Sequence, residues 1–125
     1  MSAIIKLNVF NNPIELCSEF PLTGFYRDGC CNSSKQDSGE HQICSIMDDD
    51  FLNFQYKKGN DLITPNELFG FPGLKPGNKW CVCTNRWLEA FDEGIAPKIL
   101  VKSTNKLVLN KIDLEILKKF ALDIN

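Results

Sequence analysis

The sequence predicts an α+β fold, a small single domain spanning residues 1–125 with short strands, about three short helices and long irregular loops. Its 125 residues hold no internal repeat and no Gly/Ser linker, which is typical of one domain. Three short segments carry the signals that begin and end helices. Other short apolar runs are bounded by turn residues, as strands are. Hydrophobic residues make up 43% and charged residues 24%, so neither a disordered nor a fibrous class is indicated.

The first helix is expected over residues 49–58, with the sequence DDFLNFQYKK. Asp48 can cap its first turn, and the negative charges of Asp49 and Asp50 suit the positive end of the helix dipole. Gly59 can adopt the left-handed conformation that ends a helix. These signals predict both ends of the element.

Two further helices are expected over residues 85–93 and 113–121. Thr84 or Asn85 can cap the first of them, and Gly94 follows its last turn. The second begins at an aspartate that can cap it, and its apolar residues recur at helical spacing. Both helices are short.

The strand candidates are short apolar runs between turn residues, and two of them are joined by a Thr-Asn turn. The first two candidates below carry weaker patterns than the others, and the chain between them is expected to be mostly loop. The candidates are residues 3–10, 41–46, 79–83, 98–103 and 106–109.

Charge and hydropathy exclude several classes of partner. The net charge is −2 and the 14 basic residues are spread along the chain, so no nucleic-acid footprint is present. No run of about 18 apolar residues exists for a membrane span. Polar residues interrupt the N-terminal apolar stretch before a signal-peptide core could form. We therefore expect a cytoplasmic protein whose thiols are reduced.

Six cysteines and a single histidine are the residues with the most chemical potential. Cys30 and Cys31 are adjacent, and their Cα atoms, about 3.8 Å apart, are too close for an unstrained disulfide. On an extended strand, Cys81 and Cys83 face the same side about 6.6 Å apart. Such a pair can present two thiolates to one metal ion or to one partner.

His41 and Cys44 have the spacing seen in turns that hold a metal, although on a regular strand they would face opposite sides. Cys17 stands alone. Because thiolate and imidazole are the ligands that zinc prefers, our leading hypothesis is a zinc-like metal site. Its candidate ligands are Cys30, Cys31, His41, Cys44, Cys81 and Cys83.

Two other hypotheses remain open. One thiolate could be a redox or nucleophilic centre, activated by Arg27 or Arg86 and resolved by a second cysteine. Alternatively the cysteines only fill the core, and a small-molecule or protein ligand binds near Trp80 and Trp87. The common enzyme signatures are absent from the sequence, so whether the protein is an enzyme stays open.

Several long motifs resemble a family of small bacterial proteins catalogued as domain of unknown function 2237. They are PLTGFYRDGCC (21–31), HQIC (41–44), FLNFQYKKGNDLITP (51–65) and FGFPGLKPGNKWCVCTNRWLEAFDEGIAP (69–97). The resemblance covers almost the whole chain and implies a cytoplasmic, single-domain bacterial protein. It implies no activity, because none is assigned to the family.

The resemblance does bear on the histidine. The family pattern often places a histidine after the threonine that matches Thr104, and another near the C-terminus. This sequence has Asn105 and Phe120 at those places. The comparison implies that any imidazole chemistry here falls to His41.

Overall fold

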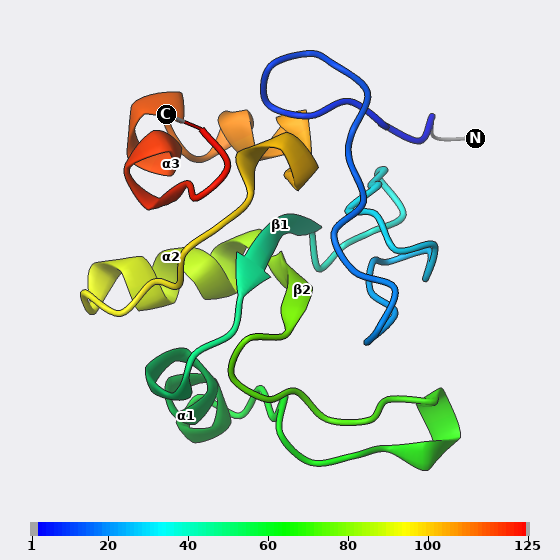
Figure 1. Ribbon diagram of the computed structural model, residues 1–125, viewed down its shortest axis with the longest axis vertical. Coiled ribbons are helices and arrows are strands. Elements are labelled where there is room, and N and C mark those ends of the chain that lie inside the picture. The colour runs from blue at the N-terminus through cyan, green and yellow to red at the C-terminus, as the bar shows by residue number, and fades with distance from the viewer. Residues whose placement is uncertain (1–2, 125) are drawn as a thin grey trace.

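An antiparallel pair of strands, β1 (His41–Ile46) and β2 (Lys79–Cys83), lies at the centre of the molecule in the computed structural model, which describes residues 3–124 (Figure 1). The register pairs Cys44 with Cys81 and His41 with Cys83, with an irregularity near the His41 end. The weaker strand candidate over 41–46 and the candidate over 79–83 are thus confirmed. The fold is a small single-domain α+β fold, as predicted.

All three predicted helices are present within a few residues of their expected ends. They are α1 (Asp49–Lys57), α2 (Thr84–Asp92) and α3 (Leu114–Phe120). Helix α2 lies against the two strands. The chain that follows α2 runs between α2 and α3 (Figure 1). Each helix uses its apolar face to cover part of the core.

Aromatic rings form the centre of that core. Trp87 of α2 is fully buried, and its ring stacks on Phe91 with centroids 5.6 Å apart. Phe120 of α3 meets Trp87 edge to face at 5.1 Å. Such pairs bury large apolar areas and pack helix α3 against helix α2.

The strands predicted over 98–103 and 106–109 are wrong. The structure has 3-10 helices there, η2 (Val101–Ser103) and η3 (Lys106–Asn110). Polar side chains explain the difference, because they bond to nearby backbone. The Thr104 hydroxyl donates to the carbonyl of Leu100 at 2.8 Å, and the Asn105 side chain accepts from the N–H of Leu107 at 2.9 Å.

The strand candidate over 3–10 is reduced to isolated bridges, such as Ile5 with Ser33. Asn105, which is fully buried, holds this segment by donating to the carbonyls of Ile5 at 2.8 Å and Cys31 at 3.0 Å. The segment 11–40 has no regular helix or strand, as expected. A third 3-10 helix, η1 (Glu67–Phe69), lies on the long loop between α1 and β2.

Two disulfides correct the expectation that all six thiols are reduced. Cys17 bonds to Cys44, and Cys31 bonds to Cys81. Cys17 therefore does not stand alone. Each bond joins the irregular N-terminal segment to one strand of the sheet, and crosslinks that close loops of these lengths contribute about 3–4 kcal/mol each in the chain-entropy account.

Within residues 3–124, no helix is both long and apolar enough to cross a membrane.

The cap of α1 gives a direct test of the local physics. The exposed Asp48 accepts a hydrogen bond from the N–H of Phe51 at 2.8 Å. We expect Asp48→Ala to lower the free energy of unfolding by about 1 kcal/mol, because a first-turn N–H loses its partner. Urea denaturation of the protein with its disulfides intact measures the change. The exposed mid-helix substitution Asn53→Ala is the control, and an equal loss in both variants would contradict the capping role.

Candidate functional site

Cys83 lies where a strand gives way directly to a helix. It is the last residue of β2, and the next residue begins α2. The helix start leaves backbone N–H groups unpaired, and the helix dipole favours negative charge there. The thiol is half-buried and is not part of a disulfide.

Sheet register brings His41 to this cysteine, because the two residues are partners across β1 and β2. Asp37, which is 2% exposed, holds the imidazole from the other side. One carboxylate oxygen lies 2.7 Å from Nδ1 of His41, and the other accepts the His41 backbone N–H at 2.8 Å. The Ser33 hydroxyl also donates to Asp37, at 2.9 Å. The ring orientation is thereby fixed, and Nε2 is left for a second partner.

Gly39 makes room for this ring. A Cβ built at residue 39 would lie 2.7 Å from Cε1 of His41, closer than such atoms approach one another. A side chain at residue 39 would therefore displace the imidazole of His41 from its place beside Asp37.

The side-chain interaction with Cys83 raises the pKa of His41 to about 9, although burial of the ring opposes the shift. The negative charges of Cys83 and Asp37, and the Asp37 hydrogen bond, act in the same direction as the main cause. At neutral pH the imidazole therefore carries a proton. A protonated histidine between a buried carboxylate and a cysteine is the arrangement that thiol-dependent enzymes use.

A cavity of about 520 Å³ opens beside His41. Its walls include Phe25, Arg27 and Trp80. The Phe25 ring stacks on His41 with centroids 6.1 Å apart, and the guanidinium carbon of Arg27 lies 4.9 Å from the centroid of a Trp80 ring. Two cationic side chains and one carboxylate, Asp61, thus border an aromatic hollow. Trp87, the other tryptophan predicted near a ligand, packs in the core instead.

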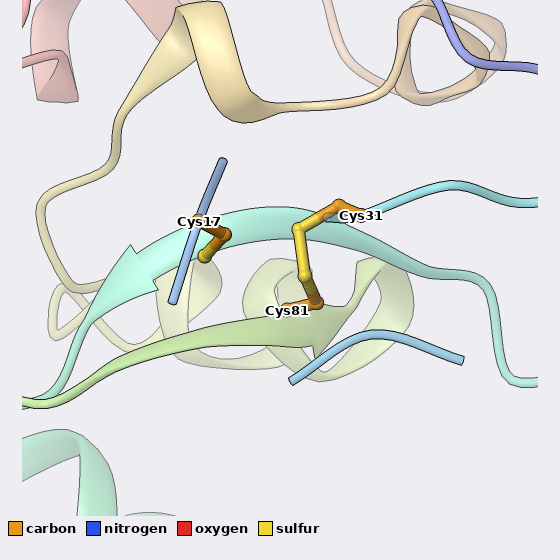
Figure 2. A group of neighbouring side chains, drawn as sticks. All are labelled: Cys17, Cys31 and Cys81. Atoms are coloured by element: carbon orange, nitrogen blue, oxygen red, sulfur yellow. A yellow bond between two sulfur atoms is a disulfide. The ribbon is translucent and has the colours of Figure 1, made fainter. Parts of the chain in front are cut away.

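The four disulfide-bonded cysteines form one buried group, which we call the four-cysteine cluster: Cys17, Cys31, Cys44 and Cys81. The sulfur atoms of Cys17, Cys31 and Cys81 all lie within 4.8 Å of one another (Figure 2). Cys44 is bonded to Cys17. Each of the four residues is at most 4% exposed. The group is compatible with structural crosslinks or, once reduced, with metal binding.

The predicted metal ligands are divided between these two places. The structure brings His41 to Cys83, and it puts Cys31, Cys44 and Cys81 into disulfides. Zinc ligation by the predicted set of six stays a prediction.

Cys30, the remaining member, is half-buried and outside any disulfide. Burial and the negative charge of Asp28 raise the pKa of its thiol. The environment of Cys30 thus opposes thiolate formation.

Of the two predicted activating cations, Arg27 borders the cavity, whereas Arg86 forms an ion pair with Glu89 at 3.2 Å.

Two residues of these sites escaped the sequence analysis. Asp37 lies four residues before His41, with Gly39 between them, a spacing that allows a turn to return a carboxylate to the imidazole. Cys17 gave no signal, because its partner is 27 residues away and its neighbours form no motif.

The fold and these sites define a class: small α+β proteins, crosslinked through cysteines, with a Cys–His–Asp constellation whose histidine lines a cavity. The model of a family described as "Uncharacterized protein conserved in bacteria (DUF2237)" matches residues 7–121. The chain belongs to this family, which confirms the resemblance in its motifs. A comparison with the curated proteins gives no match.

Because His41 is the only histidine, its ring gives an unambiguous NMR signal. We expect its titration midpoint at about 9, above the ordinary value of 6.5, because negative partners favour the imidazolium form. Cys83→Ser should lower the midpoint toward 6.5, since it removes the main cause. Cys30→Ser is the matched control and should leave it unchanged. A wild-type midpoint near 6.5 would refute the Cys83–His41 interaction.

Proposed function

We propose that the protein carries a thiol-redox centre in which Cys83 exchanges disulfides with a small-molecule substrate. The observation that carries this proposal is the order of side chains from Asp37 through His41 to Cys83. A buried carboxylate orients the imidazole, and the imidazole in turn faces a half-buried thiol at a helix N-terminus. Such an arrangement supports covalent chemistry at sulfur.

In the proposed reaction, the Cys83 thiolate attacks one sulfur of the substrate disulfide. A bond forms between Cys83 and that sulfur as the substrate S–S bond breaks. The departing thiolate takes the proton of His41 and leaves as a thiol. An incoming thiol then gives its proton to His41 and attacks the substrate sulfur bound to Cys83. The bond to Cys83 breaks, a new disulfide leaves, and the Cys83 thiolate and protonated His41 are restored.

The cavity supports a substrate with an acidic group. Arg27 and the protonated His41 both border it and together outnumber its one lining carboxylate, Asp61. The aromatic rings of Phe25 and Trp80 offer apolar surface. A small disulfide that bears a carboxylate matches both features. If the cavity instead belongs to a ligand-binding module with purely structural cysteines, ligand affinity will be independent of Cys83.

Metal binding is the second candidate function, and the four-cysteine cluster favours it. Three cysteine sulfurs within 4.8 Å of one another are ligands of the type that zinc accepts. The candidate zinc ligands of this proposal therefore include Cys17 and leave out His41.

A cytoplasmic location remains part of the proposal. Disulfides seldom persist in the cytoplasm, so the four-cysteine cluster would be expected to be reduced there. Zinc bound to the reduced cysteines would account for a buried sulfur cluster in that compartment.

Alkylation rates test the thiol proposal. In protein with both disulfides intact, iodoacetamide at neutral pH should modify Cys83 faster than Cys30, because burial and Asp28 raise the pKa of the Cys30 thiol. His41→Gln should slow the reaction of Cys83 and leave that of Cys30 unchanged. After the reaction is quenched, the protein is reduced and digested with trypsin, and mass spectrometry of the peptides that carry Cys30 and Cys83 measures both rates in one sample.

The internal comparison guards against a general effect on folding. Slow and equal modification of both thiols would contradict a reactive centre at Cys83. Equal slowing of both thiols by His41→Gln would show a change in exposure rather than a loss of activation.

A further inference from the structure

We propose that the four-cysteine cluster has two mutually exclusive states: two disulfides in the oxidised protein and one zinc ion bound by four thiolates in the reduced protein. This inference rests on the second candidate function, metal binding, and is independent of the proposed chemistry at Cys83. Its ligand set adds Cys17 to the predicted residues and leaves out Cys30, His41 and Cys83.

The geometry of the sulfurs carries the argument. Around a tetrahedral zinc with Zn–S bonds of about 2.3 Å, the ligand sulfurs lie about 3.8 Å apart. Three sulfurs of the cluster already lie within 4.8 Å of one another, and the fourth, on Cys44, is bonded to one of them. Reduction lengthens the two bonded separations, and a contraction of about 1 Å closes the others among Cys17, Cys31 and Cys81. The Cys44 sulfur, which lies outside this group of three, has to move further to become the fourth ligand.

Backbone pairing keeps the ligands together without the disulfides. Cys44 and Cys81 are opposite one another across β1 and β2. On the irregular segment, the carbonyl of Cys31 accepts the Asn105 side chain, and the N–H of Cys17 donates to the carbonyl of Gly29 at 2.8 Å. Four thiols therefore meet at one place when the crosslinks are reduced.

Burial and ligand type indicate a structural zinc site rather than a catalytic one. The four residues are between 0% and 4% exposed, so water has little access to a metal held there. Four thiolates also fill all the positions of a tetrahedral ion, whereas a catalytic zinc keeps one position open. Soft sulfur ligands select zinc over magnesium or calcium.

The interconversion balances with ordinary thiol chemistry. A dithiol reductant supplies two electrons and two protons to each disulfide and becomes a disulfide itself. Zinc then displaces four protons from the four thiols. In the reverse direction, two molecules of a small disulfide are reduced to four thiols, the cysteines form their two bonds, and the zinc ion leaves.

Cobalt(II) is the probe of choice, because its visible spectrum reports tetrahedral thiolate ligands. In this experiment, the full chain is to be reduced with a phosphine, freed of the reductant without oxygen, and titrated with cobalt. We expect one cobalt per chain, displaced by one zinc, and no binding by the oxidised protein. Cys44→Ser should lose the four-thiolate spectrum, while the double variant Cys30→Ser with Cys83→Ser should keep it.

X-ray absorption of the zinc-loaded wild-type chain covers the case in which Cys44→Ser fails to fold. Four sulfur neighbours are expected, and a nitrogen neighbour would overturn the ligand set because it would indicate His41. Absence of cobalt binding by reduced protein, or its loss in the double variant, would also overturn the proposal. The double variant lacks the Cys83 thiol, so its metal content tests the zinc proposal alone. The alkylation rate of Cys83 in the wild type tests the thiol proposal alone.

Discussion

The sulfur–sulfur contacts among four cysteines are the constraint on which the rest of this structure depends. Its only sheet within residues 3–124 has two strands, and a two-stranded ribbon is marginally stable on its own. Helix α2 covers part of it, and an irregular segment of some thirty residues must be held against it by other means. Cys17–Cys44 and Cys31–Cys81 attach that segment to each strand in turn. The closeness of three of these sulfurs, with the fourth bonded to one of them, is also the basis of the zinc-bound alternative.

The candidate site inherits its geometry from this attachment. Asp37 lies on the crosslinked segment, whereas His41 and Cys83 come from the two strands. The segment also reaches the sheet through Thr23, whose hydroxyl accepts the N–H of Cys81 at 2.8 Å. Because Asp37 is buried and accepts several hydrogen bonds, it can keep the imidazole in one orientation. A loop that moved freely would let the Asp37 carboxylate move away from His41. The crosslinks therefore help to hold the Cys–His–Asp constellation together.

Local signals in the sequence placed the three helices within a few residues, because caps, closing glycines and apolar spacing act over short distances. Asp48 caps α1 as predicted, whereas α2 and α3 begin without a side-chain cap. The local signals predicted the wrong element over 98–109. There Thr104 and Asn105 have strand-like neighbours, but their side chains bond to nearby backbone. The pairing of cysteines was beyond reach, since six cysteines allow 15 complete connectivities and spacing does not choose among them. His41 and Cys83 were both candidates, yet their contact depends on the register of strands far apart in the sequence. Asp37 was missed for a different reason: it is only four residues from His41, but burial alone distinguishes it from an ordinary turn residue.

The central claim is that the six cysteines divide into four that share one cluster and two, Cys30 and Cys83, that stay outside it. Mapping of disulfides by mass spectrometry tests it most directly, on air-oxidised protein digested without reduction after its thiols are blocked. The account predicts peptides joined through Cys17–Cys44 and Cys31–Cys81, with the blocking group on Cys30 and Cys83. A crosslink that includes Cys30 or Cys83 would contradict it.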